Sequence, residues 1–134
     1  MSQPYVYCWT YKPTGHWYIG SRTAHGCHPK DGYQSSSEIV KEGLQVCRED
    51  WEQQIWTMSS VKEALDTELY LLKHMDARND PLCLNQTNGN DGSIVLKSKP
   101  WKKRQKNTIL EEFYLKRLNN NVEERTTQPG EHNE

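Results

Sequence analysis

Two short aromatic segments joined by a turn constrain the fold of this chain more than any other feature. Residues 5–11 (YVYCWTY) are rich in aromatic and β-branched side chains, a composition typical of a β-strand. Residues 12–15 (KPTG) favour a turn, because proline presets φ and glycine accepts a positive φ. Residues 16–21 (HWYIGS) then predict a returning strand. The sequence therefore predicts a β-hairpin near the N-terminus.

The next part of the chain alternates loop, helix and strand signals. Residues 22–36 are rich in Gly, His and Ser and predict an irregular loop. Ser37 is expected to cap a short helix that ends at Gly43. Residues 52–57 (EQQIWT) are expected to form a third strand. The predicted fold class is α/β: a small, mostly antiparallel three-stranded sheet flanked by helices, followed by a basic helical C-terminal extension.

The clearest helical signal runs over residues 61–75. Ser60 and Glu63 form a capping box, in which each side chain bonds a backbone N–H that lacks a partner at the helix start. The helix carries four apolar residues at heptad spacing, and Glu68 occupies the missing position of their stripe: Val61, Leu65, Leu72 and Met75. A buried carboxylate is costly unless it is paired or bound to a metal. Glu68 is therefore the most informative single residue.

Beyond that helix the sequence changes character. Residues 82–85 (LCLN) predict a short buried segment, and residues 88–92 (NGNDG) predict an open turn. An amphipathic helix is expected over residues 107–118. The chain accordingly divides into a compact domain over residues 1–90, a basic helical extension over residues 91–118 and a disordered tail over residues 119–134.

The net charge of −1 conceals a strong asymmetry along the chain. The balance is −4 over residues 1–96, +6 over residues 97–118 and −3 over residues 119–134. Six cations and a tryptophan fall within ten residues: Lys97, Lys99, Trp101, Lys102, Lys103, Arg104 and Lys106. Such a run can follow a phosphate backbone while the indole stacks on a base, although basic runs also serve as solubilising segments. The asymmetry indicates a polyanionic partner.

The hairpin also carries a family resemblance. Tyr5-Val6-Tyr7 and Tyr18-Ile19-Gly20, with a spacing of eleven residues from Tyr7 to Tyr18, resemble the signature of GIY-YIG endonucleases. An acidic residue within a helix (Glu68) and a later asparagine (Asn85) follow in the order of that family. Residues 18–33 (YIGSRTAHGCHPKDGY), followed by three serines, are similar to phage-encoded, homing-type members. The resemblance implies a metal-dependent endonuclease that hydrolyses phosphodiester bonds in DNA with Mg²⁺ or Mn²⁺.

This chemistry suggests a role for each candidate catalytic residue. Hydrolysis needs a deprotonated water, a cation at the scissile phosphate and a metal that neutralises charge. Tyr7 is the candidate base, provided that an arginine or metal stabilises its phenolate, and Tyr18 is a candidate for orienting the water or the phosphate. Glu68 supplies a hard oxygen ligand that suits Mg²⁺ or Mn²⁺. The resemblance implies that Asn85 supports the site by hydrogen bonding, and a local Asx turn is the alternative.

The cation at the phosphate has more than one candidate. The resemblance implies an arginine about ten residues after the second tyrosine, and His28 stands there instead. Either Arg22 serves from a different backbone position, where its planar fork suits a phosphate, or His28 and Lys30 share the work.

Two other functions stay open at the level of sequence. One is a non-catalytic nucleic-acid-binding module that keeps the fold. The other is a zinc-stabilised interaction domain that uses His25, Cys27 and His28 with Cys47 or Cys83. The first residues lack the features of a signal peptide, so reduced thiols and a cytoplasmic location are expected. No apolar run is long enough to span a bilayer, so no membrane partner is expected.

Overall fold

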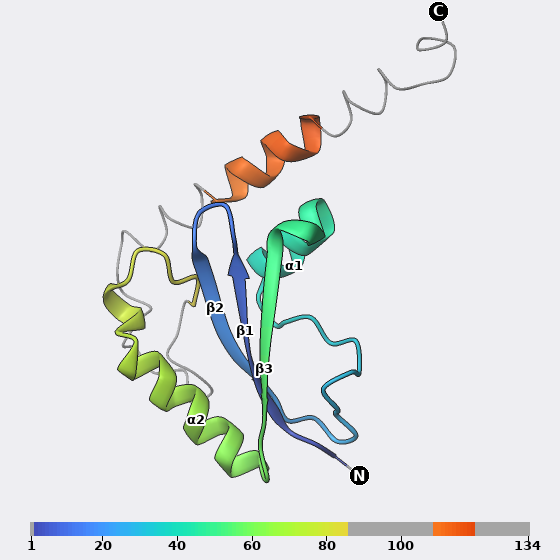
Figure 1. Cartoon of the computed structure of the whole chain (residues 1–134), viewed down its shortest axis with the longest axis vertical. Coiled ribbons are helices and arrows are strands. Elements are labelled where there is room, and N and C mark those ends of the chain that lie inside the picture. The colour runs from blue at the N-terminus through green and yellow to red at the C-terminus, as the bar shows by residue number, and fades with distance from the viewer. Residues whose placement is uncertain (1, 86–108, 120–134) are drawn as a thin grey trace, which may run out of the picture.

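The computed structural model describes residues 2–85 and 109–119 and confirms the α/β class with its three-stranded sheet. The predicted turn at 88–92, the basic run at 97–106, the domain boundary at 90 and the tail beyond 119 lie outside the described residues. The elements are β1 (Tyr5–Tyr11), β2 (His16–Arg22), α1 (Glu38–Cys47), η1 (Arg48–Asp50), β3 (Trp51–Thr57), α2 (Val61–His74), η2 (Ala77–Asn79) and a helix over residues 109–119, here called the C-terminal helix (Figure 1).

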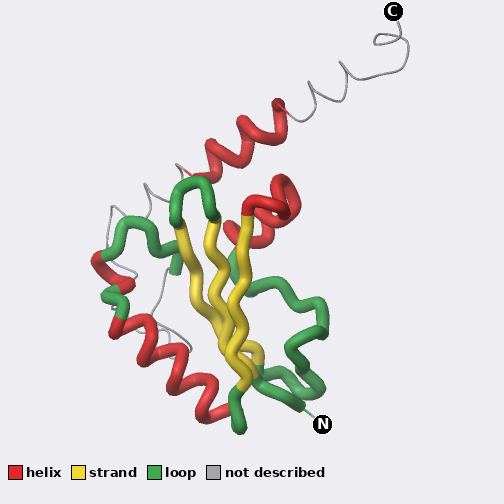
Figure 2. The backbone as a smooth tube through the Cα atoms, viewed as in Figure 1, coloured by secondary structure: helices red, strands yellow, loops and turns green. Residues whose placement is uncertain are grey.

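The sheet has the strand order β2-β1-β3, and both pairings are antiparallel. The predicted hairpin is confirmed, and Gly15 in its turn has the positive φ of 85° that favours glycine. A parallel bridge between Trp17 and Cys83 adds the predicted short segment beside β2, of which residues 83–85 are buried as expected, whereas Leu82 is 37% exposed. Since β1 lies in the centre, β2 and β3 form the two edges of the three-stranded sheet (Figure 2).

Helices cover both faces of the sheet, so the molecule has two apolar layers. The side chains at odd positions of β1 pack against α1 and the C-terminal helix. Those at even positions, Val6 and Cys8, pack with Ile19 against Ala64 and Leu72 of α2. Because successive side chains of a strand point to opposite faces, burial of both faces explains why every residue of β1 except Thr10 is hydrophobic.

The predicted end of α1 at Gly43 is wrong, because the helix continues to Cys47. A Cβ at Gly43 would lie 2.4 Å from the Trp51 ring and 2.7 Å from the Phe113 ring. Gly43 therefore allows the close approach of two aromatic side chains to the helix and does not terminate it.

The predicted buried stripe of α2 is only partly right. Ala64, Glu68 and Leu72 form the buried line, whereas Val61 is 45% exposed and Met75 is 42% exposed. The small Ala64 is fully buried between α2 and the sheet, and it defines a line spaced by four residues that the heptad pattern of larger side chains missed. Glu68 belongs to both patterns, so its predicted burial is confirmed.

Only one of the two hydrogen bonds of the predicted capping box at the start of α2 is present. The Ser60 hydroxyl accepts a hydrogen bond from the Glu63 amide at 3.0 Å. The Glu63 carboxylate, however, accepts from the amide of Ser59, at 2.6 Å, and not from that of Ser60.

The C-terminal helix belongs to the same core as the sheet. Its Ile109 and Phe113 side chains are each 1% exposed and pack in the cluster that contains Tyr11 and Trp51. Three polar contacts hold its outer side: Tyr11 donates to Glu112 at 2.5 Å, Lys116 pairs with Asp50 at 2.8 Å and Arg117 pairs with Glu42 at 2.6 Å. The chain thus returns to the sheet after residues 86–108. No helix within residues 2–85 or 109–119 is long and apolar enough to cross a membrane.

Candidate functional site around the outer strand β2

The two signature tyrosines lie together on the α1 face of the sheet. The register places Tyr7 opposite Gly20 and Tyr18 opposite Trp9, so both tyrosines point to the same face. Their ring centroids are 6.2 Å apart. A Cβ at Gly20 would lie 2.4 Å from the Tyr7 hydroxyl oxygen. The signature glycine therefore lets the Tyr7 side chain extend from β1 over the neighbouring strand β2, where its hydroxyl lies.

Three consecutive serines connect the tyrosines to the start of α1. The Tyr7 hydroxyl donates to the Ser35 hydroxyl at 3.2 Å, and the Tyr18 and Ser36 hydroxyls share a hydrogen bond of 3.2 Å. Ser35 accepts a further bond from the amide of Ser37 at 3.0 Å, and Ser37 caps α1 as predicted. These bonds fix the positions of both phenol oxygens relative to a helix N-terminus.

The electrostatics of the pair favour neutral phenols. Burial raises the pKa of Tyr7 well above its ordinary value, the charged form of Tyr18 raises it further, and the Ser35 hydroxyl offsets part of the effect. Burial likewise raises the pKa of Tyr18, against the hydrogen bond from Ser36. In this state Tyr7 is a hydrogen-bond donor, and it can act as a base only if a cation is placed beside it.

Glu68 reaches the same strand from the α2 face. Its side chain is 7% exposed, and its Oε1 accepts a hydrogen bond of 2.6 Å from the Ser21 hydroxyl, one residue after Gly20. Burial raises the pKa of Glu68, and the bond from Ser21 offsets part of this rise. Its negative charge also contributes to the raised pKa of Tyr18.

A single carboxylate is compatible with Mg²⁺ but not with zinc. Residues 2–85 and 109–119 contain no group of three or more His, Cys, Asp and Glu side chains that could hold a metal ion. Mg²⁺ keeps several waters and is often bound by one or two carboxylates together with substrate phosphates. No ion pair of the described residues includes Glu68, and its buried carboxylate accepts a hydrogen bond from Ser21.

The alternative zinc set is not assembled among the described residues. The Cys27 thiol is buried against a backbone carbonyl, and the His28 Nδ1 atom accepts a hydrogen bond from a backbone amide. His25 is exposed. Cys47 and Cys83 are buried in apolar clusters on opposite faces of the sheet, and neither belongs to a group of three or more possible ligands among the described residues.

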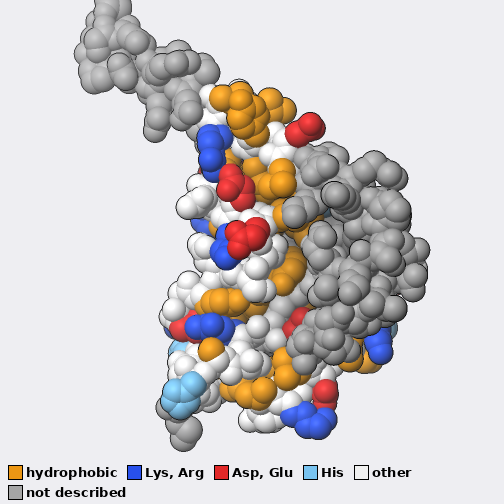
Figure 3. All heavy atoms as spheres, turned by 180° about the vertical axis from the view of Figure 1, so that it is seen from behind, with side chains coloured by type: hydrophobic (Ala, Val, Ile, Leu, Met, Phe, Trp, Pro, Cys, Tyr) orange, Lys and Arg blue, Asp and Glu red, His pale blue; other side chains and the backbone are white. Residues whose placement is uncertain are grey.

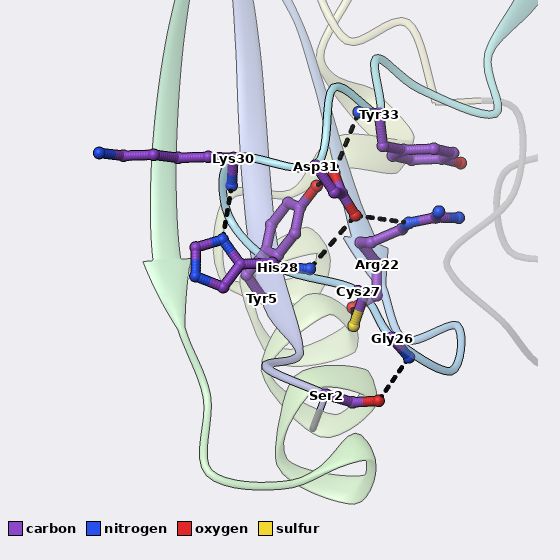
Figure 4. Close-up of polar contacts among 9 residues, drawn as sticks. All are labelled: Ser2, Tyr5, Arg22, Gly26, Cys27, His28, Lys30, Asp31 and Tyr33. Carbon is purple, nitrogen blue, oxygen red and sulfur yellow. Dashed lines mark hydrogen bonds and ion pairs between the residues drawn. The ribbon is translucent and has the colours of Figure 1, made fainter.

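Arg22, at the end of β2, contacts Tyr33, whose ring lies next to that of Tyr7. Its guanidinium carbon lies 4.1 Å from the centroid of the Tyr33 ring, and that centroid is 6.1 Å from the Tyr7 ring. Figure 4 shows the Arg22 guanidinium and the His28 ring on opposite sides of Asp31, with the Lys30 side chain extending away from Arg22. Arg22 is thus connected to Tyr7 through the Tyr33 ring, whereas His28 and Lys30 are exposed on the loop.

Asn85 supports β2 directly. Its Oδ1 accepts a hydrogen bond from the Ile19 amide at 3.0 Å, and its Nδ2 donates to the Ile19 carbonyl at 2.8 Å. The side chain is buried, and both atoms of its amide group bond the backbone of Ile19. Asn85 thus fixes the backbone between Tyr18 and Gly20, which agrees with a supporting role.

Sequence reasoning missed three residues of the site. Ser21 was detectable, because strand alternation directs the residue after Gly20 toward the opposite face, where Glu68 lies. Asp31 and Tyr33 carried no such signal, because an irregular loop has no periodicity from which to predict a contact.

The predicted nucleic-acid-binding residues lie outside the described part of the chain: Lys97, Lys99, Trp101, Lys102, Lys103, Arg104 and Lys106. On the face seen in Figure 3, the described acidic, basic and apolar side chains are interspersed. The described part of that face therefore shows no single-sign surface for a polyanion.

The described site consists of the Tyr7–Tyr18 pair and Arg22 on one face of β2, and Ser21 with Glu68 on the other. Comparison of the chain with known proteins found no matching family model, no matching curated protein and no matching solved structure.

Proposed function

We propose that this protein is a metal-dependent endonuclease of the GIY-YIG kind that hydrolyses phosphodiester bonds in DNA. One observation carries the proposal: a tyrosine pair, an arginine and a buried carboxylate converge on one edge strand. Phosphodiester hydrolysis requires groups of these types, because it needs proton transfer, a cation at the phosphate and a ligand for a metal.

Glu68 is the residue that would hold Mg²⁺ or Mn²⁺ in this site. When bound, the metal would neutralise charge on the phosphate and on the leaving oxygen. Glu68 contributes one buried carboxylate, and the Ser21 hydroxyl fixes the direction of one of its oxygens. Waters and substrate oxygens would complete a Mg²⁺ shell.

Arg22 is the residue that would bind the scissile phosphate. Its Nε is occupied by Asp31, and among the described residues neither terminal nitrogen has a hydrogen-bond partner. The side chain is 31% exposed, so these two nitrogens can reach a substrate. A planar fork of two N–H donors matches two phosphate oxygens.

The tyrosines act on the attacking water in this proposal. Tyr18 orients the water or the phosphate through its hydroxyl, which lies beside Ser36. Tyr7 removes the proton from the water only when a cation lowers its pKa, because burial alone raises that pKa. The reaction should therefore depend strictly on a divalent cation and accelerate as the pH rises.

A non-catalytic module that binds nucleic acid is the second candidate function. The neutral state of the buried Tyr7 phenol favours it, because a phenol that stays protonated can position a phosphate without cutting. A single measurement, cleavage of the DNA strand, distinguishes the two functions.

Nicking of supercoiled plasmid by the full chain tests the proposal. With Mg²⁺ the wild-type protein should convert the plasmid to nicked or linear DNA, and EDTA should stop the conversion. Tyr7→Phe should slow cleavage by about 10²- to 10⁴-fold, the usual contribution of a general base. The matched control is Tyr11→Phe, which removes a hydroxyl from the same strand and face but beside Glu112.

Three results would contradict the nuclease proposal. These are a wild-type protein that binds plasmid in a salt-dependent manner and never cuts it, cleavage that persists in EDTA, and a Tyr7→Phe variant as active as wild type. The first result would favour the binding module.

A further inference from the structure

Asp31 is the centre of the loop that follows β2. Its Oδ1 accepts hydrogen bonds from the Tyr5 hydroxyl and the Tyr33 amide, both at 3.0 Å. Its Oδ2 accepts from Arg22 Nε and from the His28 amide, both at 3.2 Å (Figure 4). One carboxylate thus joins β1, the end of β2 and two points of the loop.

This carboxylate is ionised at neutral pH. Burial opposes ionisation, but the hydrogen bonds from the Tyr33 and His28 amides and from Arg22 outweigh it and lower the pKa of Asp31 to about 2. The Asp31 side chain is 16% exposed, so solvent screens its ion pair with Arg22 less than it screens a surface pair.

The contact with Asp31 determines how Arg22 is presented. Asp31 binds the side of the guanidinium, at Nε, while the guanidinium carbon lies over the Tyr33 ring, 4.1 Å from its centroid. These two contacts restrict the rotation and the tilt of the group. The two terminal nitrogens remain at the other end of the fork, in the geometry that binds a phosphate through two oxygens.

We propose that Asp31 is the positioning residue for Arg22, holding its guanidinium in the orientation that receives a phosphodiester of the substrate. The inference rests on the proposed nuclease function and deepens it. It also explains how an arginine at the end of β2 can be held in place to bind the phosphate. The carboxylate that orients Arg22 is bound by the His28 amide as well, so Arg22 and the loop are fixed as one unit.

A purely structural role for Asp31 makes a different prediction. If Asp31 only closes the loop, its replacement should lower stability while activity per folded molecule stays constant. If Asp31 acts through Arg22, its replacement should lower activity only while Arg22 is present. A double-mutant cycle separates these cases.

The experiment compares Asp31→Asn, Arg22→Ala and the double variant for Mg²⁺-dependent cleavage of a duplex oligonucleotide. Asp31→Asn should lower kcat by about 100-fold, the effect typical of a misplacement near 1 Å, and should have no further effect in the Arg22→Ala background. Asp31→Glu, which keeps the charge, should restore part of the rate. Asp66→Asn is the matched control, because its ion pair with Lys62 is on the surface and its side chain is 64% exposed. It should cut like wild type.

A second measurement does not depend on cleavage. The Arg22 Nε–H resonance is followed in ¹⁵N NMR spectra during titration with inorganic phosphate. It should shift in wild type and Asp66→Asn, and it should be unmoved in Asp31→Asn. If the wild type cuts no DNA, the nuclease proposal fails while this titration still decides the role of Asp31.

Either of two results would overturn the inference. In the kinetic experiment, it is an equal loss of kcat from Asp31→Asn with and without Arg22. In the titration, it is an Arg22 Nε–H resonance that does not shift with phosphate in wild type, or that shifts as much in Asp31→Asn as in wild type.

Discussion

Replacing Glu68 by glutamine removes one charge from the buried line of α2 and leaves the side-chain volume almost unchanged. The Ser21 hydroxyl, which donates to Glu68 Oε1 at 2.6 Å, can donate equally to the amide oxygen of a glutamine. The substitution therefore tests the charge of Glu68 and preserves its packing. We expect it to abolish metal-dependent cleavage and to leave the fold intact.

The expected change in stability is small, because two contributions oppose each other. A hydrogen bond to a charged group contributes about 1.5–3 kcal/mol and one between neutral groups about 1 kcal/mol, so the Ser21 bond weakens by about 1 kcal/mol. Removal of a buried charge acts in the opposite direction, since burial raises the pKa of Glu68. A net change within about 1 kcal/mol corresponds to a shift in Tm of no more than about 4–8 °C.

The expected change in rate is much larger. A metal ion that polarises a phosphoryl oxygen contributes several kcal/mol to stabilisation of the transition state. If Glu68→Gln forfeits about 4 kcal/mol of this, the cleavage rate falls about 1,000-fold. Binding to DNA in the absence of metal should be unchanged, because Arg22 is not altered.

The pH dependence of stability gives an independent test of the cost of burying the Glu68 charge. The folded-state pKa of Glu68 is raised, so the ionised carboxyl disfavours the folded state once the pH exceeds its unfolded pKa, about 4.3. The free energy of unfolding of Glu68→Gln, relative to wild type, should therefore increase as the pH rises through the raised pKa. Below about pH 4 this contribution should vanish.

The assay measures cleavage of a labelled duplex and thermal unfolding on the same preparation of each variant. Asp66→Asn is the control, since it also removes one carboxylate from α2 but on the exposed side. A Glu68→Gln protein that melts well below wild type and cuts at the full rate per folded molecule would refute the assignment of Glu68 as the metal ligand.

Three further predictions test the packing around Tyr7, the burial of the C-terminal helix and the role of the basic run. Gly20→Ala should displace the Tyr7 ring, since the added Cβ would lie 2.4 Å from its hydroxyl; loss of cleavage with a stability cost of about 1–3 kcal/mol is expected, and an active variant would contradict the close approach. Phe113→Ala should lower the free energy of unfolding by about 3–5 kcal/mol in chemical denaturation, and a neutral effect would contradict burial of the C-terminal helix. Neutralising the cations of residues 97–106 should flatten the slope of log affinity for DNA against log salt by about 0.9 for each phosphate that the protein no longer neutralises, and an unchanged slope would reduce the run to a solubilising segment.

Local chemistry was sufficient to predict several elements. The turn at residues 12–15, the cap at Ser37 and the start of α2 at Ser60 each depend on a few neighbouring residues whose preferred φ or hydrogen bonds are intrinsic. The burial of Glu68 was also predictable, because helical periodicity places it between apolar neighbours whichever line of the helix faces the core.

Contacts between distant segments decided the rest. From the sequence alone, Gly43 has the properties of a residue that ends a helix. In the structure it lies within α1, where two aromatic rings, one from β3 and one from the C-terminal helix, pack against it. Asn85 bonds the backbone of Ile19, 66 residues earlier, and Asp31 gathers groups from β1, β2 and the loop. Such contacts have no period and no local composition from which they can be predicted. The amino-acid sequence by itself determined which reactive groups this protein carries and on which elements most of them lie. Only the tertiary structure decided which of them meet, because that depends on how the sheet and helices pack.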